Sequence, residues 1–164
     1  MPIVSGDILY RLSGGSGNAV QSASLGGAKS STAASTSIFD DVSSSESSAG
    51  DVEYRCIYVQ NNHGSLTLSN AVAWLPVNTP SASTVVEIGL GTSVINGTEQ
   101  TVTDESTAPS GVTFAAAATK GAGVALGNIP AGQHRAVWLR RTVSAGAAAA
   151  SDGFTIRIEG DTAA

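Results

Sequence analysis

The chain has 164 residues, of which 13% are charged, and its formal net charge is −5. A chain of this length suits one domain that buries a core of its own. Its 8 basic residues are scattered, and only Arg140 and Arg141 are adjacent, so no surface that could follow a phosphate backbone is expected. We therefore expect no direct nucleic-acid partner.

The share of charged residues is low, at about half of the roughly 25% found in typical domains. Glycine, alanine, serine and threonine take their place. Because so few charges give copies of the chain little mutual repulsion, two interpretations remain open. Either neighbouring subunits cover much of the surface in the working state, or the chain is a small-residue β-protein that hydroxyl groups keep soluble.

Targeting signals and membrane spans are not predicted. The first residues, MPIVSGDILYRLSGG, lack a basic region followed by a long apolar stretch, and no run approaches the ~20 apolar residues of a membrane helix. Cys56 is the only cysteine, so it cannot form an intramolecular disulfide. We expect a buried structural thiol in a protein that folds in a reducing cytoplasm, with no membrane partner.

The first elements are a short strand and a flexible segment. Alternating apolar residues predict the strand over 8–12. Residues 13–37 are almost entirely Gly, Ser, Ala and Thr, which bury too little apolar area to offset the entropy of ordering. This segment either packs on its own domain or is held by a neighbouring subunit, and we favour the second. We therefore expect an extended N-terminal arm over 1–37 and a folded domain over 38–164. The arm residues expected to form an assembly interface are Ile3, Val4, Val20 and Leu25.

β-Structure is predicted from residue 38 onward. Residues 51–61 (DVEYRCIYVQN) are rich in β-formers and apolar on both faces, which indicates a central strand. A compact turn at 61–65 leads into a second run over 65–76. These two strands are expected to form a long hairpin.

The rest of the chain continues this pattern, and no segment shows sustained helical periodicity with caps. About seven to nine short strands separated by turns predict an all-β fold, namely a β-sandwich with immunoglobulin-like or jelly-roll topology. The remaining predicted elements are strands over 85–90, 134–143 and 154–159, short apolar pieces at 112–114 and 124–126, and a loop over 144–153.

The acidic stretch 39–51 is the first candidate for a metal site. Its Asp40, Asp41, Glu46 and Asp51 offer oxygen ligands that calcium accepts. Their spacing does not match the EF-hand pattern, with its alternating ligands and terminal glutamate. A solvated loop leading into a strand is the favoured interpretation.

No catalytic residue, metal ligand or cofactor site is assigned. The glycine-rich segments 89–91 and 121–127 do not fit the dinucleotide fingerprint, and neither opens an evident helix. His63 and His134 lack further ligands at workable spacing. We therefore expect a protein that is not an enzyme and that needs no cofactor.

Charged residues within the predicted strands are unusual. Cross-strand pairs on exposed faces are the favoured explanation, and bidentate pairs across a subunit interface are the alternative. The residues concerned are Glu53, Glu87, Glu159, Arg55, Arg135, Arg140, Arg141 and Arg157.

Two segments of the chain resemble structural proteins encoded by tailed bacteriophages and prophages. They are FDDVSSSESSAGDVEYRCIYVQNNHGSLTLSNAVAWL and LGNIPAGQHRAVWLRRTVSAGAAAASDGFTIRIEGD. In such proteins an acidic loop runs into a YRC strand, and a PAG…VWLRRTV strand lies near the C-terminus. The resemblance covers the chain from Phe39 onward and implies a β-sandwich module of the virion. It brings no catalytic residue.

The function expected from this resemblance is that of a capsid decoration, or cement, protein. Trimers or dimers would bind the major capsid protein and other copies of the chain on the capsid surface of the virion, after folding in the bacterial host cytoplasm. There they would stabilise the coat lattice. A neck, tail-tube or baseplate component is the alternative. A carbohydrate-binding adhesion module ranks third, because Trp74 and Trp138 lie in strand patterns that indicate burial.

Overall fold

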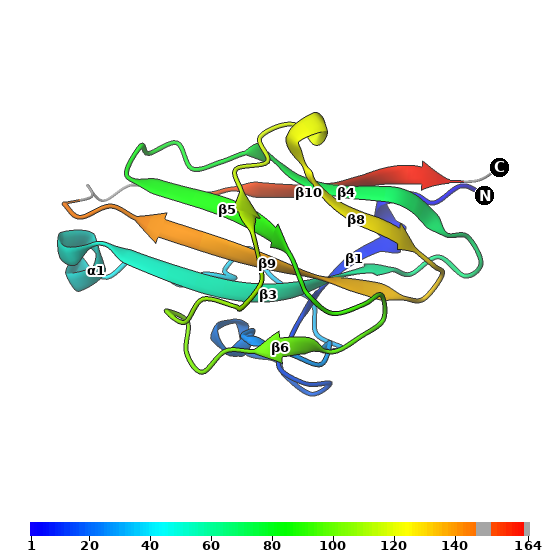
Figure 1. Ribbon diagram of the computed structural model, residues 1–164, viewed down its shortest axis with the longest axis horizontal. Coiled ribbons are helices and arrows are strands. Elements are labelled where there is room, and N and C mark those ends of the chain that lie inside the picture. Colours follow the sequence, from blue (N-terminus) through cyan, green and yellow to red (C-terminus); the bar gives the residue numbers. More distant parts are fainter. Residues whose placement is uncertain (147–151, 163–164) are drawn as a thin grey trace.

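The computed structural model describes residues 1–146 and 152–162, so part of the predicted 144–153 loop lies outside the described residues. Antiparallel strands dominate it, as the sequence predicts (Figure 1). Its strands are β1 (Ile8–Leu12), β2 (Gly26–Gly27), β3 (Asp51–Asn61), β4 (Leu68–Val77), β5 (Thr84–Leu90), β6 (Glu99–Thr101), β7 (Phe114–Ala115), β8 (Val124–Ile129), β9 (His134–Val143) and β10 (Thr155–Thr162). The helical elements are α1 (Ser44–Ala49) and three single turns of 3₁₀-helix, at Ser5–Asp7, Gln21–Ala23 and Lys120–Ala122.

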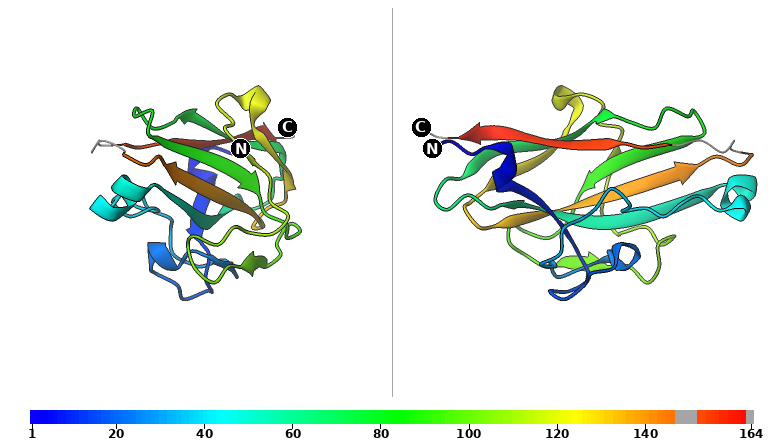
Figure 2. Two further views of the ribbon diagram at one scale, coloured as in Figure 1. Left: turned by 60° about the vertical axis from the view of Figure 1, so that its left-hand side comes forward. Right: turned by 180° about the vertical axis from the view of Figure 1, so that it is seen from behind.

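The strands form three antiparallel sheets. A five-stranded main sheet has the order β1-β3-β9-β5-β7, a second sheet has the order β10-β4-β8, and a small sheet pairs β2 with β6. The second sheet packs on one face of the main sheet, and side chains from both sheets share one apolar core (Figure 1). Figure 2 shows the small sheet and its flanking loops on the opposite face of the main sheet.

The central position predicted for residues 51–61 is confirmed, because β3 pairs with β1 on one side and with β9 on the other. Both of its faces are buried, since side chains alternate across a strand. Ile57 and Val59 join the core shared with the second sheet. Cys56 and Tyr58, on the other face, join a second apolar cluster beneath the small sheet.

The predicted hairpin between residues 51–61 and 65–76 is wrong. β3 belongs to the main sheet and β4 to the second sheet, so residues 62–67 cross from one layer to the other. Both edges of β3 are already occupied, which leaves β4 no position beside it. The His63 ring shapes the crossing, because its Nδ1 accepts hydrogen bonds from the backbone N–H groups of Ser65 (3.1 Å) and Leu66 (3.0 Å).

Residues 1–37 do not extend away from the domain in this structure. β1 is an edge strand of the main sheet, and the chain after it folds back over that sheet (Figure 2). Hydroxyl groups replace the missing apolar anchors: the buried Ser13 and Ser24 both donate to the carbonyl of Cys56, at 2.9 and 2.6 Å. Ser24 Oγ also accepts from the Ser13 N–H at 2.8 Å, and Ser13 Oγ accepts from the Gly26 N–H at 2.9 Å. Because buried polar groups are stable when hydrogen-bonded, a segment poor in apolar side chains can still pack.

Gly26 shows how closely this segment approaches the sheet beside it. Its φ is +94°, a region that favours glycine, and a Cβ placed there would lie 1.8 Å from the carbonyl oxygen of Gln100. No other residue fits, so the glycines of the segment serve close packing and not only flexibility.

The four residues predicted for an assembly interface fall into two groups. Ile3 packs against the core shared by the main and second sheets, and Leu25 packs against the cluster beneath the small sheet. Val4 and Val20 keep 58% and 56% of their surface exposed. Of the four predicted residues, only Val4 and Val20 are exposed enough to contact a neighbour over most of their side chain.

A short helix replaces part of the solvated loop expected over 39–51. Helix α1 begins after Ser43, whose Oγ accepts from the Glu46 N–H, while the Glu46 carboxylate accepts from the Ser43 N–H at 2.6 Å. This reciprocal pair is a capping box, and its Ser-x-x-Glu signature is visible in the sequence. The helix ends at Gly50, where φ is +80°.

The expected burial of Cys56 is confirmed: the residue is fully buried. Burial raises the pKa of its thiol far above the ordinary value. Such a thiol stays protonated and unreactive at neutral pH. Among the described residues, no helix is both long enough and apolar enough to span a membrane.

The serine network predicts a test of how residues 13–37 are held. Replacing Ser24 with Ala removes the donor to the Cys56 carbonyl and leaves the Ser13 N–H without its acceptor. We expect the free energy of unfolding to fall by about 1–3 kcal/mol, measured by urea denaturation. Ser22→Ala, at an exposed site two residues away, is the control and should cost less than about 0.5 kcal/mol. Equal effects of the two substitutions would contradict this account.

Candidate functional site

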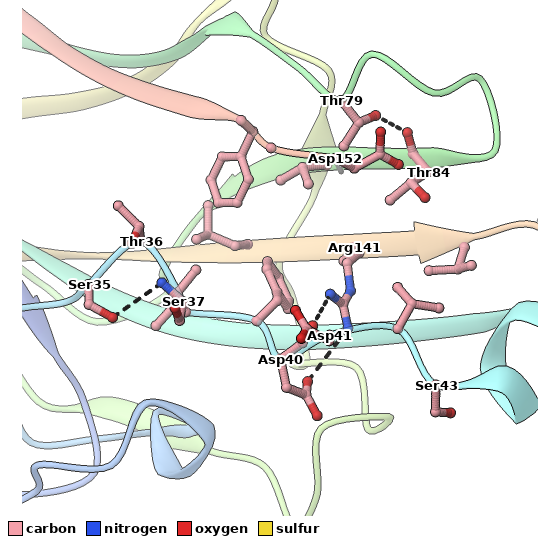
Figure 3. A pocket seen from close by; sticks show the side chains of 18 of the residues that line it. Ser35, Thr36, Ser37, Asp40, Asp41, Ser43, Thr79, Thr84, Arg141 and Asp152 are labelled. Carbon is pink, nitrogen blue, oxygen red and sulfur yellow. Dashed lines mark hydrogen bonds and ion pairs between the residues drawn. The ribbon is translucent and has the colours of Figure 1, made fainter. Parts of the chain in front are cut away.

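An open groove lies at one end of the two-sheet core (Figure 3). The segment 34–48 runs along one side of it, and the start of β10 lies on the other. Its apolar floor includes Val86, Leu139 and Val143 of the main sheet. The rim is polar and carries serine and threonine hydroxyls, Asp40, Asp41, Asp152 and Arg141. No histidine, cysteine or lysine lies among its described lining residues.

Beside this groove, β3 and β9 place a buried ion pair directly across the main sheet. Glu53 and Arg141 are opposite each other in the strand register, with exposures of 1% and 7%. Both Nε and Nη2 of Arg141 contact the same oxygen of Glu53, and Arg141 Nη1 donates to the backbone carbonyl of Asp40. The cross-strand pairing expected for these residues is correct, but the expected exposure is wrong. Phe39 and Asp40 pack against Arg141 and help to shield the pair from water.

Arg55 adds a second buried guanidinium on the same face of β3. Its Nε donates to the carbonyl of Ile38 at 3.2 Å, and its Nη2 contacts the carboxylate of Glu105. Asp40 Oδ1 lies 3.6 Å from Nη2 of both arginines, Arg55 and Arg141. The acidic segment is thus fastened to the sheet through its backbone as well as its side chain.

Phe39 stacks over both guanidinium groups. Its ring centre lies 5.0 Å from Cζ of Arg141 and 5.6 Å from Cζ of Arg55. On its other side it meets Phe154, near the start of β10, in an edge-to-face contact at 6.2 Å. Cation–π contacts strengthen when the cation is shielded from water, as it is here. Phe39 therefore links the ionic cluster of the main sheet to the edge of the second sheet.

The three carboxylates Asp40, Glu53 and Glu105 lie close enough to one another, within 4.8 Å, to be considered as a metal site. However, Nη2 of Arg55 lies within ion-pair distance of all three of them. The guanidinium stands where a bound cation would balance the same charges, and Arg141 neutralises Glu53 a second time. The three carboxylates are therefore better explained as partners of Arg55 and Arg141 in a network of internal ion pairs than as calcium ligands. Of the acidic residues considered from the sequence, only Asp40 joins it; Asp41, Glu46 and Asp51 do not.

Burial raises the pKa of Glu53 to about 7, against the opposing attraction of Arg141 and with a further raising effect from Asp40. Its second oxygen, Oε1, has no hydrogen-bond partner among the described residues. Since removing a carboxylate from water favours its neutral form, Glu53 is the member of the cluster most ready to take up a proton.

Glu99 is a second buried carboxylate, on the opposite face of the main sheet. Burial alone would raise its pKa, but hydrogen bonds from the backbone and side chains of Ser93 and Thr92 lower it to about 2. Thr92 Oγ1 donates to one carboxylate oxygen and the Ser93 N–H to the other, each at 2.9 Å. The Glu99 N–H in turn donates to the Tyr58 hydroxyl, which donates to the carbonyl of Gly27. Glu99 therefore ties the loop before β6 to β3 and to β2.

The sequence contained a signal for the buried cluster. Glu53 and Arg55 lie in a strand that is apolar on both faces, where any charged side chain has to be buried and paired. Asp40 and Glu105 gave no comparable signal, because they approach β3 from loops distant in sequence. Their positions follow from tertiary packing alone.

The tryptophans considered for carbohydrate binding do not form an exposed platform. Trp138 is fully buried, and the half-buried Trp74 lies under the guanidinium of Arg157, whose Cζ is 5.7 Å from the ring centre. His63 and His134 do not form a common site. His63 shapes the β3–β4 crossing, and His134 packs edge-on against Tyr58, with the ring centres 4.8 Å apart.

Comparison with protein families, with curated proteins and with solved structures finds no match to this chain.

The raised pKa of Glu53 predicts a defined dependence of stability on pH. A folded-state pKa of about 7 against an ordinary value of 4.5 means that the folded protein binds the extra proton. The stabilisation is complete below pH 4.5 and is lost as the pH rises through 7. We expect the wild type to lose stability relative to Glu53→Gln over this window, by on the order of 2 kcal/mol in urea titrations.

Comparing the two proteins at each pH cancels the contribution of other groups, such as His134, whose pKa burial lowers. Glu99→Gln is the matched control, because a pKa lowered to about 2 confines its effect to the window between 2 and 4.5. A constant difference between wild type and Glu53→Gln from pH 4.5 to 7 would show that Glu53 stays ionised throughout.

Proposed function

We propose that the chain is a non-catalytic structural protein of a tailed-phage virion, specifically a capsid decoration protein that binds the outer shell and stabilises the coat lattice. The resemblance of its 39–75 and 126–161 segments to phage and prophage virion proteins is the starting point. The two-layer packing of the main and second sheets supports a β-sandwich module, with the immunoglobulin-like or jelly-roll topology that this resemblance implies.

The observation that carries the proposal is where the charged side chains lie. The sequence has few of them, and several are turned inward: Glu53, Arg55, Arg141 and Glu99 are buried, and Glu87 pairs with Arg140 across β5 and β9. The outer surface therefore carries fewer charged side chains than the sequence contains. A surface that opposes association so weakly suits a protein packed among neighbours.

Isolated valines supply apolar contacts on that surface. Val94 is 74% exposed, and Val4 and Val20 are each exposed by more than half. Burying one such side chain against a coat subunit contributes about 1.5 kcal/mol. A single contact of this size is weak. Many copies bind the same coat lattice, however, and each copy that bridges two coat subunits adds to the stability of the lattice.

Copy number distinguishes this proposal from the alternative of a neck, tail-tube or baseplate component. A decoration protein is present in hundreds of copies per particle, whereas a ring component is present in a few or a few dozen. Quantitative mass spectrometry of purified virions, with the coat protein as internal standard, measures this ratio. A ratio that corresponds to only a few or a few dozen copies per particle would contradict a decoration role.

The exposed valines of the first residues predict a binding test. Deleting residues 1–37 would remove β1 and the cover of the main sheet, so point substitutions are required. We expect Val4→Asp or Val20→Asp to weaken binding to heads assembled from the coat protein of the same genome by about tenfold, measured by co-sedimentation. Val77→Asp, equally exposed on β4, is the control and should bind as the wild type does. If neither arm substitution changes binding, these valines are not the contact.

A further inference from the structure

β10 is an open edge of the second sheet. It pairs with β4 on one side, and no backbone hydrogen bond joins its other side to any residue that the structure describes. In Figures 1 and 2 it runs along the rim of the molecule as the red strand. An edge of this kind presents unpaired N–H and C=O groups that another strand can complete.

Nothing in β10 itself blocks such pairing. Edge strands are usually protected by proline, by a bulge or by a charge pointing inward. The sequence of β10, TIRIEGDT, has no proline, and its charged residues alternate with the core-facing Ile156 and Ile158. The register with β4 is irregular at two places, but the extra residue is on β4 each time: Thr155 to Arg157 spans Val77 to Trp74, and Glu159 to Asp161 spans Val72 to Ser69.

The outward-facing backbone groups can be assigned. The Tyr10 hydroxyl, reaching up from β1, lies 3.5 Å from the carbonyl oxygen of Ile156 at this edge and also contacts the backbone of Ile158. Because backbone groups alternate along a strand, Ile156, Ile158 and Gly160 turn theirs outward, and Arg157 and Glu159 turn theirs toward β4. The contact with Ile156 is at the long limit for a hydrogen bond. An incoming strand that turns the Tyr10 side chain aside can therefore pair with the backbone groups of Ile156 and Ile158.

The side chains of β10 are complementary to themselves. We propose that two copies of the chain pair antiparallel through β10, with the two-fold axis at Ile158. This register places Arg157 of each copy opposite Glu159 of the other. The two side chains lie on the outer face of the sheet, with 60% and 36% of their surface exposed. Opposite charges directly across an antiparallel pair stabilise it, and the two-fold axis repeats the pair.

Neighbouring registers lack this complementarity. Moving the axis to Arg157 places two arginines opposite each other, and moving it to Glu159 places two glutamates there. Like charges at directly opposed positions are destabilising. In the proposed register, Arg157 and Glu159 also occupy the non-hydrogen-bonded positions, where opposed side chains are closest. Ile158 then meets Ile158 of the second copy on the inner face, which covers apolar surface that is only half-buried in a single copy.

The present contacts of these two side chains leave them free to pair again. Glu159 lies 3.3 Å from Lys120 and 3.8 Å from Arg157 of its own chain, and Cζ of Arg157 lies 5.7 Å from the ring centre of Trp74. Exposed ion pairs of this kind contribute little. A second copy would join the two second sheets into one continuous sheet. This inference rests on the proposed function, which expects copies of the chain to associate. It deepens that function by identifying the surface through which the copies meet.

Charge reversal tests the register. In Arg157→Glu both positions are acidic, and in Glu159→Arg both are basic, so each variant opposes like charges in its own dimer. We expect either substitution to weaken the dimer by on the order of tenfold to a hundredfold, measured by sedimentation velocity over a range of concentrations. Mixing the two variants restores both opposed pairs, so a heterodimer should form with about wild-type affinity. The double variant Arg157→Glu/Glu159→Arg should also dimerise.

Lys120→Ala is the control, because it removes a partner of Glu159 outside the interface and should leave the dimer intact. Circular dichroism and thermal unfolding confirm that each variant is folded. A wild type that stays monomeric at every concentration overturns the inference, as does a dimer that persists in both single variants or a mixture that forms no heterodimer. Capsid binding is measured separately: a monomer that binds heads contradicts only this inference, and a dimer that does not bind them contradicts only the proposed function.

Discussion

The burial of both faces of β3 is the constraint on which the rest of the structure depends. A single second sheet could cover only one face, so the chain needs another layer for Cys56 and Tyr58. Residues 13–37 and the β6 region supply it, although they have few apolar side chains. Hydrogen bonds from Ser13, Ser24 and Tyr58 take the place of apolar contacts there. Because the buried groups are paired, this polar layer packs against a strand that would otherwise be exposed to water.

The burial of β3 also requires its charged side chains to be paired. Glu53 and Arg55 alternate with Tyr54 and Cys56, which face the small sheet, so they lie on the same face of β3 as Ile57 and Val59. An unpaired charge would be costly there. Arg141, Asp40 and Glu105 gather around them from one strand and two loops. The acidic segment 39–41 is therefore held by the charges it neutralises, and Phe39 extends the contact to Phe154. The ionic cluster is a consequence of strand burial and connects three parts of the fold.

Sequence patterns predicted the strands better than their arrangement. The β3, β9 and β10 patterns are local, because alternation and β-forming residues act within one strand, and all three elements are present. The hairpin prediction failed since pairing depends on which edges are free, and β1 and β9 had taken both edges of β3. The arm prediction weighed apolar area alone and left out the hydroxyl bonds to Cys56. Only part of the ionic cluster could be predicted from the sequence. Glu53 and Arg55 could be identified from the strand pattern, whereas Asp40 and Glu105 reach the cluster through long-range packing.

Internal pairing also determines what remains at the surface. Charges that are buried and paired within the fold, such as Glu53 and Arg141, are not available to repel a neighbour or to specify one. β10 differs, because its free backbone edge and the opposed signs of Arg157 and Glu159 occur on one strand. Backbone pairing alone would accept any extended strand, whereas an arginine and a glutamate two residues apart favour a partner with the reverse order. An antiparallel second copy supplies that order without any other sequence, which is why specificity for self follows from so few charges.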